Sequence, residues 1–258
     1  TDTVEGFEAL MRWNHPERGQ ISPALFIPIA EESSLIWDLG LWAIQRACRD
    51  AAQWPGKSRV AVNVSPIQFA DPRFPAAIDD ALSGSGLAAA RLELEITEGV
   101  FMAETNETNA MFTALKSRGV RLALDDFGTG YSSLSYLQTA PFDKIKIDQS
   151  FVRGATEPGS RNGAIIAAIV ALAEALEMDT TAEGIESLDE FELIRNLNVS
   201  HVQGYVYSKA VSQEQLVENL EGGRWVIEPA GPAHHRNDRL SMYRKVRIIH
   251  ENHVYSIV

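Results

Sequence analysis

Short apolar or alternating segments recur along the chain, and stretches with the residue preferences of helices separate them. This order is typical of repeated strand–helix units around a parallel sheet. The pattern predicts seven strands, at residues 6–13, 59–64, 91–96, 120–125, 143–148, 179–184 and 201–205.

Helix signals lie between these segments. Ser22 followed by Pro23 predicts an N-cap and a first-turn proline. The run "NGAIIAAIVALAEALEM" predicts a long, nearly all-apolar helix at residues 162–178, which we expect to pack against the sheet.

Within the predicted strands, alternate residues face opposite sides. In "RLELEI", Glu93 and Glu95 therefore share one face, and the leucines and the isoleucine share the other. The same alternation groups Ala61 with Asn63, Lys144 with Lys146, and Glu8 with Leu10 and Arg12. Each strand thus has an apolar face for helices and a face that ends in a charge or an amide.

Repeated strand–helix units predict an α/β fold of the eight-stranded barrel kind, whose active site lies at the carboxyl ends of the strands. Polar residues occur at those ends: Glu8, Asn63, Glu95, Asp125, Asp126, Lys146, Glu183 and Gln203.

Each of these residues also has an ordinary structural explanation. Asp125 and Asp126 precede a glycine-rich turn that they could cap, and a lone glutamate or lysine usually lies on a solvated face or in an ion pair. Their recurrence on successive strands favours a shared site instead. Carboxylates that converge on one barrel mouth repel one another without cations, so we infer two Mg²⁺ or Mn²⁺ ions. His15 and His201 do not have the paired spacing of a zinc site.

Composition narrows the function further. The 258 residues, 45% of them hydrophobic, are enough for one large domain and a tail. A net charge of -12 argues against binding a DNA or RNA polymer, although a small phosphate ligand could bind through metal ions. Cys48 is the only cysteine, and neither a membrane span nor a signal peptide is recognisable, so we expect a cytoplasmic, reducing environment.

Motifs along the chain resemble the EAL family of bacterial cyclic di-GMP phosphodiesterases. They are "EALMRW" at residue 8, "NVS" at 63, "LEITEG", "DDFGTGYSSL", "KIKIDQSFV", "AEGIE" and "QGYVYSK". The resemblance runs from about residue 6 to about residue 222, in family order. It implies a TIM-like (β/α)8 barrel that hydrolyses one phosphodiester of cyclic di-GMP to linear pGpG with Mg²⁺ or Mn²⁺.

The resemblance also implies roles for the strand-end residues. One ion would be held by Glu8, Asn63, Glu95 and Asp125, and a second by Asp125 with Asp126, so that Asp125 bridges. Glu183 would act as general base or metal ligand, Lys146 would lie near the nucleophilic water, and Glu8 is essential to catalysis. Substrate contacts are implied for Leu10, Arg12, Asn63, Asp126, Lys146, Glu186 and Gln203.

The glycine-rich loop after Asp126 is implied to govern substrate and metal binding and to lie near a dimer interface. Gly128 and Gly130 free its backbone. Glu98 matches the glutamate that anchors this loop, although it could instead cap the next helix. A homodimer is therefore expected, as is a sensory or GGDEF-type domain elsewhere in the full protein.

The chain departs from the family pattern at both ends. It begins at what would be the second strand of the family pattern, so we expect the first helix and strand of that pattern to be missing from this chain. We expect the barrel at residues 1–222 and a linker with a basic β-type tail at 223–258. The tail could begin another domain such as PilZ, form a surface hairpin, or cover the open seam of the barrel. Gln149, Ser200 and Ala210 are smaller departures.

Two rival functions remain open at this point. A catalytically silent receptor would bind cyclic di-GMP and signal through a protein partner, but such receptors usually lack some metal ligands. Another metal-dependent barrel enzyme, an aldolase or decarboxylase, would explain the carboxylates and not the motifs. The resemblance also allows tethering to a membrane through regions outside this chain.

Overall fold

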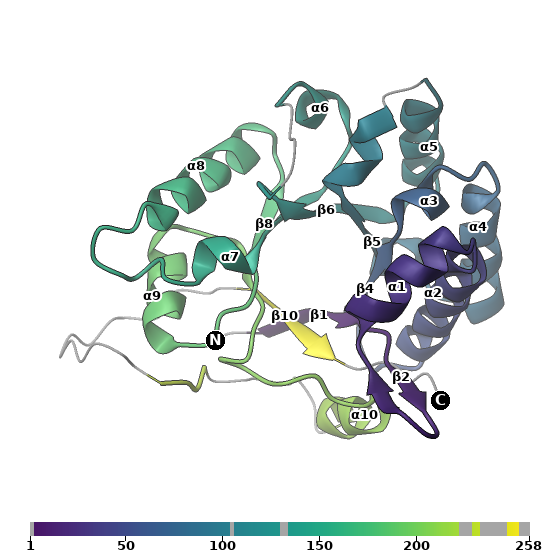
Figure 1. The fold of residues 1–258 in the computed structure, drawn as a ribbon, viewed down its shortest axis with the longest axis horizontal. Helices are drawn as coiled ribbons and strands as arrows, with labels where there is room; N and C mark the ends of the chain where they lie inside the picture. Colours follow the sequence, from purple (N-terminus) through teal and green to yellow (C-terminus); the bar gives the residue numbers. More distant parts are fainter. Residues whose placement is uncertain (1–2, 104–105, 130–133, 222–228, 233–246, 253–258) are drawn as a thin grey trace.

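The structure, a computed structural model, describes residues 3–103, 106–129, 134–221, 229–232 and 247–252. Within these residues, parallel strands close into a barrel in the order β1-β10-β9-β8-β7-β6-β5-β4, and helices surround it (Figure 1). The barrel strands are β1 (Thr3–Ala9), β4 (Arg59–Val64), β5 (Leu92–Thr97), β6 (Arg121–Phe127), β7 (Lys144–Ile147), β8 (Asp179–Ala182), β9 (His201–Val202) and β10 (Arg247–Asn252).

Most connections between the barrel strands contain helices, as parallel strands require. They are α1 (Pro23–Glu32), α2 (Ile36–Ala52), α3 (Pro66–Phe69), α4 (Phe74–Ser85), α5 (Asn106–Ser117), α6 (Leu134–Thr139), α7 (Gln149–Val152), α8 (Asn162–Ala175), α9 (Leu188–Asn196) and α10 (Gln213–Glu221), with the 3₁₀ turns η1 (Ala89–Arg91) and η2 (Glu98–Ala103).

The outer faces of the strands form the hydrophobic core. On β5, Leu92, Leu94 and Ile96 are fully buried against the helices, while Glu93 and Glu95 are buried inside the barrel. The predicted alternation is therefore confirmed on this strand. It gives the barrel a polar interior.

Strand bounds differ most from prediction at the first strand. β1 begins at Thr3 and ends at Ala9, so Leu10 and Arg12 do not continue its inner face. Trp13 instead opens the short strand β2 (Trp13–His15), which pairs antiparallel with β3 (Gly19–Ile21). This hairpin leads the chain away from the barrel.

The middle strands follow the prediction closely. β4 has the predicted bounds, and β5, β6 and β7 begin within one residue of them. β8 and β9 end earlier than predicted, so Glu183 and Gln203 lie in the loops just beyond their strands. The side chains of Glu183 and Gln203 therefore reach the barrel mouth from loops and not from the hydrogen-bonded strands.

The tail supplies the strand that completes the barrel. β10 pairs in parallel with β1 along its length, with Glu251 opposite Glu8, and with β9 at Arg247 and Ile248. Of the arrangements considered for the tail, the structure shows coverage of the seam between β1 and β9 (Figure 1). Residues 253–258 of the predicted hairpin lie outside the described residues, and the division of the chain at residue 222 stays a prediction.

The predicted helices are present. α1 begins at Pro23 with Ser22 in the N-cap position, although the Ser22 side chain makes no capping hydrogen bond. α8 covers residues 162–175 and packs on β7 and β8. In the part of the chain that the structure describes, none of the helices is both long and apolar enough to cross a bilayer.

Candidate active site

The strand-end residues converge at the carboxyl end of the barrel, around the side chain of Lys146. Its Nζ lies 2.7 Å from Glu95 Oε2, 3.0 Å from Asp125 Oδ1 and 2.6 Å from Glu183 Oε1. Glu8 Oε2 is 3.9 Å away. Side chains from β1, β5, β6, β7 and the loop after β8 therefore meet at one point, because the carboxyl ends of the parallel strands lie at the same end of the barrel.

Glu8 is held by two amides from opposite sides. Asn63 Nδ2 donates to Glu8 Oε1 at 2.7 Å, and Gln203 Nε2 donates to Glu8 Oε2 at 2.6 Å. Both oxygens of this buried carboxylate are thus fixed. The second bond joins the two sides of the seam that β10 fills.

Close backbone packing positions Gln203. The backbone N–H of Gln203 donates to Ala182 O, and the N–H of Ile185 donates to Gln203 O. A Cβ on Gly204 would lie 2.2 Å from Ile185 O, so glycine is required for this approach. The "QGY" segment therefore brings its amide against β1.

The turn after β6 adopts a strained backbone. Asp126 has φ 52° and Gly128 has φ 95°, and a Cβ on Gly128 would lie 2.9 Å from Phe151 Cε2. Glu98 Oε1 accepts a hydrogen bond of 2.9 Å from the Gly128 N–H. Glu98 thus contacts the turn that directly follows β6, the strand that carries Asp126; Gly130 lies outside the described residues.

The excess of carboxylates shifts proton affinities at the site. Burial and the charge of Glu8 raise the pKa of Glu95 well above its ordinary value. Burial, with the charges of Asp125 and Glu8, likewise raises the pKa of Glu183 to about 8. Burial and the charge of Asp125 raise the pKa of Asp126 to about 6.

At two groups of the site, Glu8 and Lys146, the neighbouring groups instead favour the ionised form. Burial disfavours the charge of Glu8, but Lys146 and the two amides outweigh it, so the pKa of Glu8 lies below its ordinary value. Burial also disfavours the ammonium of Lys146, yet the charges of Asp125 and Glu183 raise its pKa well above the ordinary value. Lys146 is therefore a permanent cation at the centre of the site.

The donor set fits divalent metal ions. One carboxylate oxygen from each of Asp125, Asp126 and Glu183 lies within 4.8 Å of the others. Glu95 Oε1 is buried and has no hydrogen-bond partner among the described residues. A buried carboxylate oxygen without a donor is costly unless a cation satisfies it, and oxygen ligands suit Mg²⁺ and Mn²⁺.

Leu10, Arg12 and Glu186 are not among the residues that pair with Lys146. Leu10 and Arg12 follow β1, and Arg12 Nη1 donates to the neighbouring Met11 O at 2.9 Å. Glu186 is exposed in the loop after β8, with Arg153 Nη2 at 3.8 Å from its carboxylate. The ion pairs around Lys146 thus bring carboxylate ligand candidates together, and these three residues are not part of them.

The sequence reasoning missed Asp148. Its side chain accepts a hydrogen bond from the Ser150 N–H at the start of α7. The charge of Asp148 and a hydrogen bond between the Asp148 and Asp126 side chains also contribute to the raised pKa of Asp126. Strand alternation could have found it, because Asp148 stands two residues after Lys146 in the strand predicted at 143–148.

Comparison with known proteins agrees with this geometry. The model of the EAL domain matches residues 1–210. The chain belongs to the EAL domain family. It is 46% identical over 213 residues to an uncharacterised signalling protein of Caulobacter vibrioides, a match that covers 83% of this chain and 26% of that protein.

A second curated relative is the bifunctional diguanylate cyclase/cyclic di-GMP phosphodiesterase MucR of Pseudomonas aeruginosa. It is 36% identical over 219 residues, which cover 83% of this chain and 32% of MucR. The EAL chain thus spans about a quarter to a third of the length of these relatives.

Solved structures share the fold. The PaMucR phosphodiesterase in complex with c-di-GMP has a TM-score of 0.72 and 37% identity, covering 76% of this chain and 80% of that one. The Klebsiella pneumoniae BlrP1 complex with manganese and cy-diGMP at pH 9.0 has a TM-score of 0.69 and 32% identity, covering 80% of this chain and 51% of BlrP1.

Proposed function

We propose that this EAL domain hydrolyses one phosphodiester bond of cyclic di-GMP to give linear pGpG, using two Mg²⁺ or Mn²⁺ ions. The observation that carries the proposal is the buried cluster at the barrel mouth, in which four carboxylates surround the single ammonium of Lys146 and Asp126 lies beside them. The solved relatives with cyclic di-GMP and manganese support it.

The proposal assigns ligands to each of the two ions. Glu8, Asn63, Glu95 and Asp125 would hold one ion, and Asp125 with Asp126 the other. Such a pair supplies an activated water and stabilises the attacking and leaving oxygens of an in-line displacement. Asn63 and Gln203 keep the Glu8 carboxylate in one orientation, so that ligand is preorganised.

Glu183 would accept a proton from the attacking water, and Lys146 would orient that water. The raised pKa of Glu183, about 8, suits a general base that accepts the proton of the attacking water near neutral pH. Lys146, with its raised pKa, stays protonated beside Asp125 and Glu183 and orients that water. Arg12 offers a fork of donors to a phosphate, and Leu10, Glu186 and Gln203 complete the substrate contacts.

Assembly belongs to the same proposal. We infer a homodimer, and control by a sensory or GGDEF-type domain elsewhere in the full-length protein. The greater length of the curated relatives and the two activities in the name of MucR support this view.

The test is incubation of the purified chain with cyclic di-GMP, with and without Mn²⁺ or Mg²⁺, with pGpG measured by chromatography. A binding titration in Ca²⁺ accompanies it. Metal-dependent formation of pGpG, lost in Asp125→Asn, is the expected result. Tight binding without product at every ion concentration would contradict the enzyme and identify a receptor.

A further inference from the structure

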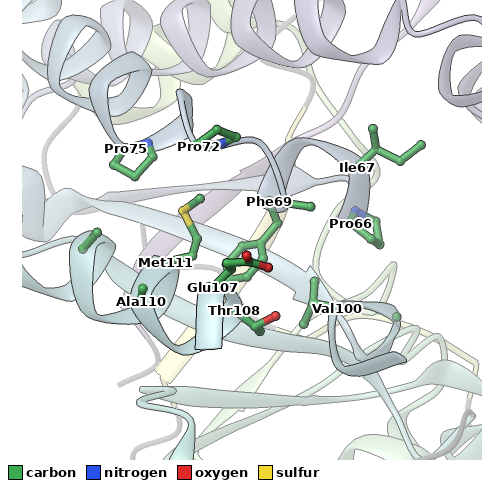
Figure 2. A pocket seen from close by; sticks show the side chains of 13 residues that line it. Pro66, Ile67, Phe69, Pro72, Pro75, Val100, Glu107, Thr108, Ala110 and Met111 are labelled. Atoms are coloured by element: carbon green, nitrogen blue, oxygen red, sulfur yellow. The ribbon is translucent and has the colours of Figure 1, made fainter. Parts of the chain in front are cut away.

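A second concave site lies on the outside of the barrel, away from the carboxylate cluster. It is a cavity of about 780 Å³ between α3, the segment leading into α4, η2 and α5 (Figure 2). We call it the outer pocket. Its volume is within the range of pockets that take small organic molecules.

The walls of the outer pocket are apolar and stiff. Phe69 is 2% exposed and packs against Phe112, with the ring centroids 4.8 Å apart, and Met111 is 8% exposed. Figure 2 shows Phe69 and Met111 at the pocket. Pro66, Pro72 and Pro75 are among the lining residues, and Figure 2 shows Pro72 and Pro75 close together. Because proline fixes its own backbone, these walls are already in place before a ligand arrives.

The polar part of the pocket is small and negative. Glu107 and Thr108 are the lining residues with polar side chains, and Glu107 is exposed on the first turn of α5. Together with the net charge of -12, this carboxylate favours a cationic head group and disfavours an anionic one.

The pocket walls continue into the segments that carry the metal-ligand candidates. Pro66 follows Asn63 by three residues, and Gly99 is next to Glu98, whose carboxylate holds Gly128. A Cβ on Gly99 would lie 3.3 Å from Pro66 Cγ, so α3 and η2 touch at this end of the pocket. A ligand that moves either wall would move the loops beside the cluster.

We propose that the outer pocket binds a small amphiphilic amine, with an aromatic or aliphatic body and a cationic head, and that its occupation is linked to metal binding at the barrel mouth. The apolar floor takes the body, and Glu107 faces the ammonium. The linkage runs through α3 and η2.

Binding is tested with dansylcadaverine, a fluorescent aromatic amine, against its N-acetylated, neutral counterpart. Ala110 lines the pocket and is exposed on α5, so Ala110→Trp fills the pocket without disturbing the core. Asn109→Trp, one position along the same helix and outside the lining, is the matched control. Saturable binding to the wild type and to Asn109→Trp, and its loss in Ala110→Trp, is expected.

A separate substitution, Glu107→Gln, tests the contact between Glu107 and the ammonium group of the ligand. Glu107→Gln should weaken the amine about two- to five-fold, the effect of an exposed ion pair, and leave the neutral probe unchanged. Equal binding of the amine to wild type and Ala110→Trp would overturn the site. Self-association that only Ala110→Trp abolishes, with no probe binding, would instead identify a second copy as the occupant and also overturn the proposal.

Linkage is tested by the same titration with and without Mn²⁺. Because coupling between two sites is reciprocal, the probe affinity should change about five-fold when Mn²⁺ is present, and the Mn²⁺ affinity should change equally with probe. The same probe affinity in both conditions would refute the linkage. Neither readout depends on turnover, so a failure here is distinct from a failure of the proposed hydrolysis.

Discussion

The inside of the barrel contains two polar layers built by the same strand alternation, and they differ in charge balance. The mouth layer places Lys146 among Glu8, Glu95, Asp125 and Glu183. The lower layer, toward the amino ends of the same strands, contains Glu5, Arg59, Glu93, Arg121, Lys144 and His201.

In the lower layer each described acid meets a base. Lys144 forms a close, fully buried ion pair with Glu93, and Arg121 Nε lies 3.3 Å from the same carboxylate. Glu5 contacts Arg59 at 3.1 Å and His201 at 3.3 Å. Lys144 and the arginine lower the pKa of Glu93 against its burial, whereas in the mouth layer the pKa of Glu95 is raised.

This contrast separates a structural layer from a functional one. Both layers contain fully buried charged side chains, Glu95 and Lys146 in one and Glu93 and Lys144 in the other, so burial alone does not distinguish them. In the lower layer the basic side chains of the protein neutralise the carboxylates. In the mouth layer the carboxylates outnumber the basic side chains, so bound cations are needed to neutralise the remaining charge. Substitutions in the two layers should therefore affect different properties of the protein.

Removing a ligand from the mouth layer should have the largest effect. Glu8→Ala deletes a carboxylate that the proposal assigns to an ion, so turnover of cyclic di-GMP should fall by about 10²- to 10³-fold. The measurement is kcat as a function of Mn²⁺ concentration. Glu8→Gln keeps the side-chain volume and should be similarly impaired, because charge and not volume is the cause. Turnover close to that of the wild type in either variant would refute the ligand role.

Breaking a pair in the lower layer should change stability and not turnover. Lys144→Met leaves Glu93 buried with Arg121 as its remaining partner, so the free energy of unfolding should fall by about 3 kcal/mol, the low end for a broken buried pair. Urea unfolding measures it.

The controls for this prediction come from the same strand and the same pair. Glu93→Leu/Lys144→Met should recover most of the lost stability, because no unpaired charge remains. Lys146→Met, the same substitution two residues along β7, should abolish turnover. If the Lys144→Met variant folded and still lost its turnover, the lower layer would belong to the active site. That result would refute the distinction between a structural layer and a functional one.

Much of this organisation could be predicted from the sequence. The alternation in "RLELEI" and "KIKID" depends only on the two-residue repeat of a strand, so it correctly identified inward residues such as Glu95 and Lys146. The strand-end carboxylates pointed to one mouth because parallel strands share a carboxyl edge.

Other features depended on contacts that alternation does not encode. Alternation put Glu93 and Lys144 on the same face as the ligand candidates, and it could not show that they satisfy each other. It also missed the end of β1 at Ala9, where the hairpin of β2 and β3 takes over. The seam strand β10 lies far along the chain from its neighbour β1, and its pairing depends on tertiary structure.

The free energy of unfolding should depend on pH with opposite signs in the two layers. The pKa of Glu183 is raised to about 8 from an ordinary value of 4.5, so without metal the folded protein binds more protons than the unfolded chain between these values. The free energy of unfolding, measured in a chelator, should therefore fall as the pH rises from 5 to 8, by roughly 1–2 kcal/mol when protons are shared within the cluster. Glu183→Gln should flatten this slope.

The lower layer supplies the control for the pH prediction. The pKa of Glu93 is lowered, so its contribution is already complete above pH 5 and is lost only as the pH falls below its ordinary value. Glu93→Gln should thus change stability equally at pH 5 and pH 8. Mn²⁺ binds the ionised carboxylates, so its affinity should rise over the range in which Glu183 loses its proton. A flat stability profile for the wild type in chelator, parallel to that of Glu183→Gln, would contradict the surplus charge from which the metal site is inferred.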